Sequence, residues 1–370
     1  MKSWIAVCLC FVVGCVLIGC VSAPQPSRVS PTDPAIRYGG YFDTRDPNAP
    51  RFAWPGTHLE ARFSGTSLRV KLTSTPVADE TRDNDWIAVV IDGGEPKVFA
   101  LAEGEHVYPL ASGLPQGTHH VLIWKRTEPE VGTITFHGFV LEDGAKVGPP
   151  IPEPRRRMFF IGDSITAGYG NEGPNMTCTW HVAYENNYAT YGAVAARMLG
   201  AQYVATAWSG KGISRNYEER DVETMPQLYR RVIPTELDSP KAPAVPADVV
   251  VVNLGTNDFG RGVPDKASML GAFDALLGEL RRDHPEALAV LVLGPMLFDD
   301  PDGSPQRTLM REWLNELRAQ RSAAGDTAIE LIEVWTDPAE GLGCDAHPNA
   351  RTHARIGAEL AALVKQKLRW

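Results

Sequence analysis

The hydrophobic pattern of this chain changes its period at a proline-rich stretch, and this change limits the folds that the chain can adopt. Before the stretch, apolar and polar residues alternate in short runs, as at residues 58–63 and 68–73. After it, nearly continuous apolar runs alternate with segments of helical period. The stretch itself is residues 148–154, Gly-Pro-Pro-Ile-Pro-Glu-Pro. Alternation is typical of strands with one buried face, and continuous apolar runs are typical of strands buried on both faces. The sequence therefore predicts two domains of different class.

The first domain, residues 36–147, is expected to be an antiparallel β-sandwich or jelly roll. Further strand-like runs occur at residues 86–91, 121–124 and 134–140, with turn signals such as Asp-Gly-Gly and Ser-Gly between the runs. No stretch of helical period separates them. Short alternating strands at this spacing are typical of sandwiches.

The second domain, residues 158–370, is expected to be an α/β domain with a doubly wound parallel sheet, joined to the first by a linker at 148–157. Its apolar runs predict buried strands, and helical segments such as residues 269–280 lie between them. In such sheets, ligands bind at the carboxyl ends of the strands. The strands are expected at residues 158–161, 203–207, 249–254, 289–293 and 329–334.

The N-terminal residues 1–20 have the pattern of an export signal. Lys2 is followed by an apolar run at residues 5–18, which is short for a membrane span. The segment ends Leu-Ile-Gly-Cys at Cys20, which resembles a bacterial lipobox and implies lipidation of Cys20. A Val next to that cysteine resembles lipoproteins of the Gram-negative outer membrane. The alternative is an ordinary secretory signal cut after Ala23. Residues 21–35, rich in Pro and Ser, are expected to be a flexible tether.

Export changes the cysteine count. Of the six cysteines, three lie within the signal and Cys20 would carry lipid, which leaves Cys178 and Cys344. Two thiols in an oxidising compartment suggest one disulfide. Two separate buried thiols are the alternative.

Four polar or glycine positions follow predicted strands. Ser164 comes after the first strand, Gly210 after the second and Asn257 after the third, and His347 follows the fifth and precedes a helix. A serine at a strand-to-helix turn exposes its hydroxyl, and Gly and Asn at such ends can present N–H groups to a developing negative charge. Each feature alone is equally consistent with a helix cap or a tight turn.

Together, in this order, the four residues resemble the SGNH (GDSL-type) hydrolase superfamily. The resemblance implies that Ser164 is the nucleophile and that His347 is the general base and then the acid. It implies an oxyanion hole made of the N–H groups of Ser164 and Gly210 and the amide of Asn257. The Cys344–His347 spacing has no second pair of metal ligands beside it, so neither a metal nor a cofactor is expected.

The likeness extends to carbohydrate esterase family 2, whose members include acetylxylan esterases. It implies removal of acetyl groups from polysaccharides such as xylan and glucomannan, at primary hydroxyl positions. The motifs that carry it are Arg-Phe-Ala-Trp-Pro-Gly at 51–56, Gly-Tyr-Gly-Asn-Glu at 168–172, Tyr-Glu-Asn-Asn-Tyr at 184–188, Thr-Tyr-Gly-Ala at 190–193 and Gly-Cys-Asp-Ala-His-Pro-Asn at 343–349.

The group that orients His347 differs from the superfamily pattern. Most of these enzymes place an aspartate three residues before the histidine, and that position here is Cys344. Asp345 lies two residues before it, so its side chain is expected to leave the backbone in another direction. A backbone carbonyl is therefore expected to hold Nδ1 of His347, with Asp345 in a supporting role. The alternative is that the loop bends enough to bring Asp345 onto His347.

Aromatic residues near these motifs are candidate sugar platforms, and core packing is the alternative for each. Trp335 and Trp208 are favoured because they neighbour the motifs, and Phe259 and Trp180 are weaker candidates.

Other functions stay open at this point. An esterase of the same superfamily could act on peptidoglycan, lipid or thioester acyl groups, and a carbohydrate-binding lipoprotein could carry its function in the jelly roll. Export and the two-domain build favour a sugar ester over a cytosolic thioester. A formal net charge of −9 argues against a general nucleic-acid binder, because phosphate binding needs a basic face.

Overall fold

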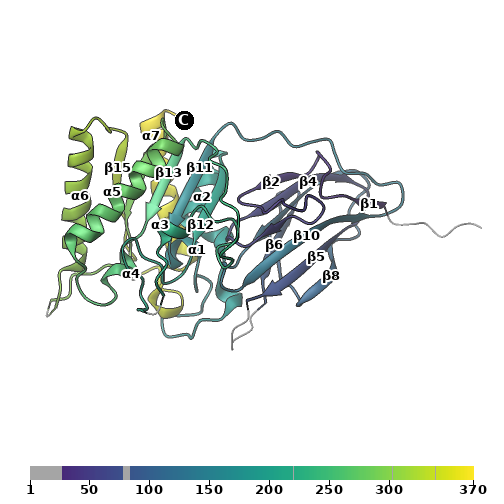
Figure 1. Cartoon of the computed structure of the whole chain (residues 1–370). Coiled ribbons are helices and arrows are strands. Elements are labelled where there is room, and N and C mark those ends of the chain that lie inside the picture. Colours follow the sequence, from purple (N-terminus) through teal and green to yellow (C-terminus); the bar gives the residue numbers. More distant parts are fainter. Residues whose placement is uncertain (1–26, 78–83, 220, 302, 338) are drawn as a thin grey trace, which may run out of the picture.

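The computed structural model describes residues 27–77, 84–219, 221–301, 303–337 and 339–370. It consists of two domains that lie side by side (Figure 1). Residues 148–156, which contain no helix or strand, connect them. The export signal of residues 1–20 and the candidate lipidation site Cys20 lie outside the described residues.

The first domain is an antiparallel β-sandwich, as the alternating pattern predicts. Two five-stranded sheets enclose one apolar core. Leu59, Ala61 and Phe63 point into this core and are fully buried, whereas Glu60 and Arg62 between them are partly exposed. Its strands are β1 (Ser27–Val29), β2 (Arg37–Gly39), β3 (Arg51–Phe52), β4 (His58–Ser64), β5 (Leu68–Pro76), β6 (Trp86–Ile91), β7 (Lys97–Ala100), β8 (Gly104–Ala111), β9 (Thr118–Lys125) and β10 (Gly132–Leu141).

The order of strands in one sheet is β2-β4-β9-β6-β7. In the other sheet it is β1-β10-β5-β8, with β3 also paired to β10.

The predicted tether is too long at its C-terminal end. Strand β1 pairs antiparallel with β10, with Ser27 opposite Leu141, and Ala35 is buried. Residues 27–35 therefore belong to the sandwich. An edge strand is held through its backbone hydrogen bonds, so it needs no apolar alternation, and the composition gave no sign of it.

The second domain is an α/β domain with a doubly wound sheet of five parallel strands. Phe159 and Ile161 face the helices on one side of the sheet, and Met158 and Phe160 face those on the other. Its elements are β11 (Arg157–Gly162), α1 (Ser164–Ala167), η1 (Val182–Tyr184), η2 (Asn187–Ala189), α2 (Tyr191–Leu199), β12 (Gln202–Ala207), α3 (Met225–Leu228), β13 (Val249–Asn253), α4 (Thr256–Phe259), α5 (Lys266–Asp283), β14 (Leu288–Leu293), α6 (Gln306–Ala323), β15 (Ile329–Glu333), η3 (Cys344–Ala346) and α7 (Ala350–Leu368).

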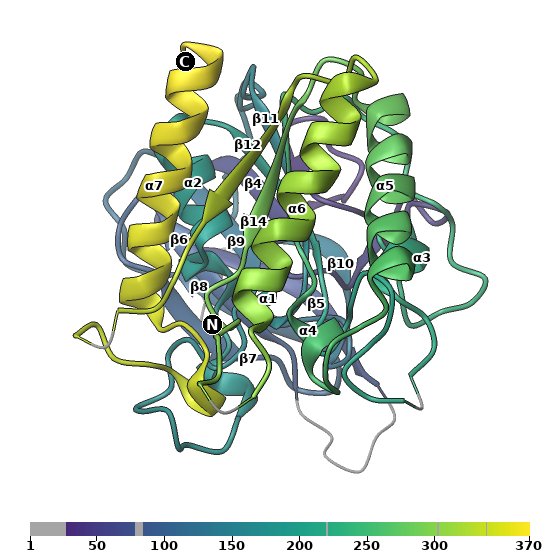
Figure 2. The same ribbon diagram turned by 90° about the vertical axis from the view of Figure 1, so that its left-hand side faces the viewer.

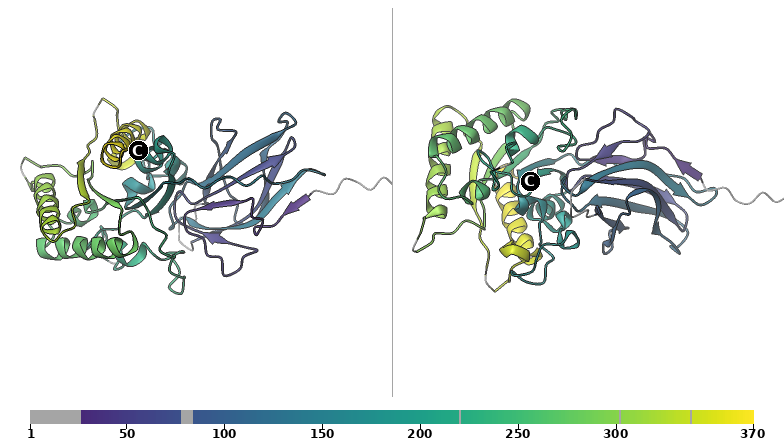
Figure 3. Two further views of the ribbon diagram at one scale, coloured as in Figure 1. Left: turned by 90° about the horizontal axis from the view of Figure 1, so that it is seen from above. Right: turned by 60° about the horizontal axis from the view of Figure 1, so that its bottom comes forward.

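The strand order is β12-β11-β13-β14-β15, and every neighbouring pair is parallel. Helices α5 and α6 cover one face and α2 and α7 the other (Figures 2 and 3). Because the strands are parallel, the turns that follow β11, β12 and β13 meet at the same edge of the sheet. None of the helices within the described residues is long and apolar enough to cross a membrane.

The two domains share an apolar core. Trp124 of β9 stacks on Tyr203 of β12, with ring centroids 5.2 Å apart, and its indole N–H donates to Asn187 Oδ1 at 3.2 Å. Ala88 of β6 is buried in the same cluster. This contact fixes the loop that follows β9 beside the second domain.

Candidate active site

Ser164 and His347, which are 183 residues apart, meet at the carboxyl edge of the parallel sheet. Ser164 is the first residue of α1, where Asp163 caps the helix by accepting from the Ile165 N–H at 3.0 Å. His347 lies between η3 and α7. The distance from Ser164 Oγ to His347 Nε2 is 2.8 Å. A hydroxyl and an imidazole nitrogen are therefore in hydrogen-bond contact at the place where the sequence expects them.

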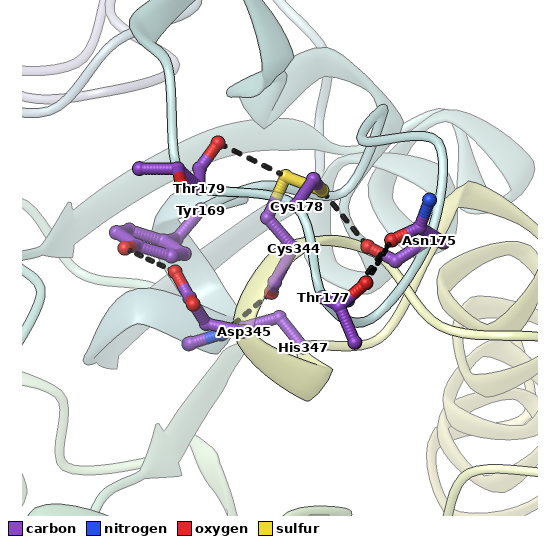
Figure 4. The surroundings of a disulfide bond; sticks show 8 residues. All are labelled: Tyr169, Asn175, Thr177, Cys178, Thr179, Cys344, Asp345 and His347. Carbon is purple, nitrogen blue, oxygen red and sulfur yellow. Dashed lines mark hydrogen bonds between the residues drawn. A yellow bond between two sulfur atoms is a disulfide. The ribbon is translucent and has the colours of Figure 1, made fainter.

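A backbone carbonyl faces the other nitrogen of this imidazole. His347 Nδ1 lies 3.2 Å from the carbonyl oxygen of Cys344. The carboxylate of Asp345 turns elsewhere and accepts a hydrogen bond from the Tyr169 hydroxyl at 2.8 Å (Figure 4). Asp345 has a left-handed backbone, with φ of 51°, which directs its side chain away from His347. Nδ1 can donate to the carbonyl, and this fixes the tautomer that leaves Nε2 free to accept from Ser164.

Burial sets the charge of the imidazole. It lowers the pKa of His347 to about 4, and the hydrogen bonds to the backbone at Cys344 and Asp345 oppose this shift. At neutral pH His347 is therefore uncharged. This is the form that can take up a proton.

Three possible hydrogen-bond donors to an oxyanion lie at the Ser164 hydroxyl, and one of them is the N–H of Ser164 itself. Gly210 has a φ of 75°, and a Cβ on it would meet no atom within 4 Å, so this turn opens onto the cleft. Asn257 Nδ2 donates one hydrogen to the Lys211 carbonyl at 2.9 Å, which orients the amide and leaves its second hydrogen available. Among the described residues, the N–H groups of Ser164 and Gly210 have no acceptor. All three residues line a cleft of about 1090 Å³, together with His347.

The aromatic candidates lie in different places. Trp208 lines the cleft, and its indole N–H donates to Glu130 at 3.0 Å. Phe259 also lines the cleft, but its side chain is 1% exposed and packs against Trp313, so little of its ring faces the cleft. The phenyl ring completes the apolar core beneath α4 and α6 instead.

The two other tryptophans are not among the residues that line the cleft. Trp335 is 55% exposed, and the Arg307 guanidinium covers its ring at 5.3 Å from the centroid. Trp180 stacks on Tyr169 with ring centroids 5.6 Å apart. Trp335, a favoured candidate because of its place in the sequence, is therefore a surface residue outside the cleft.

A disulfide joins Cys178 and Cys344 (Figure 4). It links the loop before η1 to η3, the turn that carries the carbonyl facing His347. The Cys344 N–H also donates to the Gly170 carbonyl at 3.0 Å. A Cβ on Gly173 would lie 2.3 Å from Cys344 Sγ, so only glycine allows this close approach.

Two residues that contact the site were missed by the sequence analysis. The Tyr169 ring lies 4.5 Å from the His347 ring, and Glu128 of the sandwich domain accepts from Ser209 beside Gly210. For Tyr169, the available signal was its place in the motif Gly-Tyr-Gly-Asn-Glu at 168–172. For Glu128, the available signal was a run of charged residues directly after a buried strand, at 125–130.

The chain resembles known proteins in both halves. Residues 38–150 match the family "Carbohydrate esterase 2 N-terminal", and residues 160–355 match the "GDSL-like Lipase/Acylhydrolase family". The structure superposes on a family two carbohydrate esterase from Clostridium thermocellum, solved in complex with cellohexaose, with a TM-score of 0.84. The two share 34% identity over 90% of this chain and 99% of that one.

Two curated relatives show the same likeness in sequence. The chain is 26% identical over 351 residues to an acetylxylan esterase / glucomannan deacetylase of Cellvibrio japonicus, covering 92% of this chain and 91% of that one. It is 35% identical over 342 residues to the cellulase/esterase CelE of Acetivibrio thermocellus, covering 91% of this chain. It spans 40% of the length of CelE. With both halves matched in the same order along the chain, this protein belongs to carbohydrate esterase family 2.

Proposed function

We propose that this carbohydrate esterase removes acetyl groups from hemicellulose such as xylan or glucomannan, with Ser164 as nucleophile and His347 as base. The observation that carries the proposal is the 2.8 Å contact between Ser164 Oγ and Nε2 of the neutral His347. The contact lies in a cleft that Ser164 and Gly210, whose N–H groups have no acceptor among the described residues, also line. The Cellvibrio japonicus relative, an acetylxylan esterase / glucomannan deacetylase, supports the choice of substrate.

In the first half of the reaction, Ser164 Oγ attacks the acetyl carbonyl carbon while His347 Nε2 takes the hydroxyl proton. The carbonyl oxygen becomes negative, and the N–H groups of Ser164 and Gly210 and the amide of Asn257 donate to it. When this intermediate collapses, the bond to the sugar oxygen breaks. That oxygen takes the proton from His347 and leaves as a hydroxyl.

In the second half, a water molecule attacks the acetyl group on Ser164, and His347 takes its proton. The same donors hold the second oxyanion. The bond to Ser164 Oγ then breaks, the serine recovers its proton from His347, and acetic acid leaves and gives up its proton to water, which yields acetate. The Cys344 carbonyl holds the imidazole through both halves, but it bears only a partial charge and stabilises the imidazolium less than a carboxylate would.

The test is acetate release, followed by NMR, from acetylated xylan, acetylated glucomannan and O-acetylated peptidoglycan side by side. Ser164→Ala and His347→Ala should each lose several orders of magnitude in turnover with the fold intact by circular dichroism. The double variant should lose little more, because the two groups act as one unit. Acetate release from peptidoglycan alone would show that the substrate is peptidoglycan and not hemicellulose. A Ser164→Ala variant that keeps half its activity would end the mechanism.

We also propose that the protein is exported and anchored by lipid at Cys20, facing the periplasm or the surface at a bacterial outer membrane. Support comes from the lipobox pattern of residues 17–20 and from the disulfide, since disulfides persist in oxidising compartments. Mass spectrometry of the mature protein would show a diacylated N-terminal cysteine. Cys20→Ser should release the protein from membranes, and a wild-type chain recovered unlipidated and soluble from the cell would refute the anchor.

A further inference from the structure

A carboxyl group of the sandwich domain holds the turn that carries Gly210. The Ser209 N–H donates to Glu128 Oε2 at 2.5 Å, and the Ser209 hydroxyl donates to Oε1 at 2.6 Å. Glu128 comes from the loop between β9 and β10, whereas Ser209 follows β12. One side chain therefore reaches across the domain boundary and contacts two groups of a single residue.

The loop that carries Glu128 is anchored on both sides of that boundary. The Lys125 ammonium lies 2.7 Å from Asp85 and donates to the Glu128 carbonyl at 3.2 Å, and Lys125 and Asp85 are fully buried. On the other side, Arg126 Nε donates to the Glu185 carbonyl at 3.1 Å. A loop held in this way is rigid, so it can fix the position of a residue that it contacts, such as Ser209.

Ser209 stands directly before Gly210, so its orientation sets that of the Gly210 N–H. Peptide planes are rigid, and only two backbone dihedrals separate the Ser209 N–H from the Gly210 N–H. Glu128 fixes the first N–H and also the side-chain hydroxyl of the same residue. The neighbouring Trp208 is held from the same loop, by the bond of its indole to Glu130. Placement of an oxyanion donor matters, because a misplacement of about 1 Å at a reacting centre lowers rates by about a hundredfold.

The buried environment of Glu128 disfavours a negative charge on its carboxyl group. Burial raises the pKa of Glu128 to about 8, Glu130 adds to the shift, and the two hydrogen bonds from Ser209 oppose it. This raised pKa favours the protonated form of Glu128. The two contacts persist in that form, because a hydroxyl such as that of Ser209 accepts as well as donates.

We propose that Glu128 is a positioning residue of the oxyanion hole, which sets the Gly210 N–H by holding Ser209. The inference rests on the catalytic roles proposed above for Ser164 and Gly210. It gives the sandwich domain a part in the reaction without contact with the substrate.

The test compares Glu128→Leu with Glu128→Gln. Leu cannot bond Ser209, so kcat should fall about 10- to 100-fold while KM stays within about threefold, because an oxyanion donor acts in the transition state. Gln offers one acceptor and one donor in place of the protonated carboxyl, so it should keep kcat within about threefold of wild type. The substrate is an acetylated xylo-oligosaccharide, and unfolding temperatures are measured in parallel.

Glu142→Leu is the matched control. Glu142 accepts from the N–H and hydroxyl of Thr66 in the same two-point manner, and it is not among the cleft-lining residues. This variant should keep kcat at the wild-type value. An equal fall of kcat in Glu128→Leu, Glu128→Gln and Glu142→Leu would show a general structural effect and overturn the inference.

Ser209→Ala keeps the test decisive if Glu128→Leu does not fold. It removes the hydroxyl contact alone and should lower kcat about 3- to 10-fold at unchanged KM. A Ser209→Ala or Glu128→Leu variant with wild-type kcat would overturn the role of Glu128, even where Ser164→Ala is inactive and the proposed function stands. An inactive wild-type chain would instead remove the proposed function.

Discussion

The carbonyl oxygen of Cys344 lies 3.2 Å from Nδ1 of His347, in the place that an aspartate holds in a Ser-His-Asp triad. Asp345, the next residue, turns its carboxylate to the Tyr169 hydroxyl. Two neighbouring residues of η3 therefore have different tasks. The Cys344 carbonyl orients the base, and the Asp345 carboxylate holds the Tyr169 hydroxyl, whose ring lies beside His347.

Asp345→Asn should therefore lower kcat about tenfold or less. The amide keeps an oxygen that accepts from Tyr169, and the partner of His347 Nδ1 is untouched. The measurement is turnover of an acetate ester at pH 7, with Ser164→Ala as the inactive reference. A loss of about ten-thousandfold, typical of a triad aspartate, would show that Asp345 reaches His347 during the reaction.

The pH dependence should reflect the buried imidazole. His347 acts as a base only when neutral, and burial lowers its pKa to about 4 from an ordinary value of about 6.5. kcat/KM should therefore stay level as the pH falls from 7 to about 5 and decline only as it approaches 4. The profile is measured with an uncharged ester in buffers of constant ionic strength. An acid limb centred near 6.5 would contradict the effect of burial.

Asn257→Ala should be milder than loss of the serine or the histidine. It removes one oxyanion donor, and such losses lower kcat by about 100- to 1,000-fold. KM should change little, because the donor acts on charge that develops in the transition state. Thr256→Ala, on the neighbouring residue of α4, serves as a control for damage to the helix. Wild-type kcat in Asn257→Ala would remove this residue from the oxyanion hole.

Loss of the disulfide should affect activity as well as stability. In Cys178→Ser the Cys344 carbonyl remains, but the turn that carries it loses its covalent link to the loop before η1. We expect kcat to fall severalfold and the unfolding temperature to drop, since native disulfides contribute about 2–5 kcal/mol. Thiol counting on the denatured mature protein should find no free thiol without reductant. Two free thiols would refute the bond in the cell.

The strands of the second domain could be predicted because continuous apolar runs report burial on both faces. Phe159 and Phe160 point to opposite sides of the sheet, and both are buried. The edge strand β1 could not be predicted, since backbone pairing with β10 holds it. The positions of Phe259 and Trp335 in the sequence did not show that the first ring is buried and that the second lies outside the cleft, because side-chain direction depends on packing. Glu128 contacts Ser209, which lies far from it in the sequence. A pattern of neighbouring residues carries no information on such a contact.

Trp124 also bears on how the protein unfolds and how it can be divided. Its indole lies between the His58 ring, 4.7 Å away, and the Tyr203 ring of the other domain. Pulling the domains apart would expose these rings to water, so we expect one cooperative heat-absorption peak in calorimetry. Residues 158–370 expressed alone would present Tyr203 and Tyr188 on a bare apolar face and should aggregate. An attempt to shorten this enzyme for use in solution has to keep both halves.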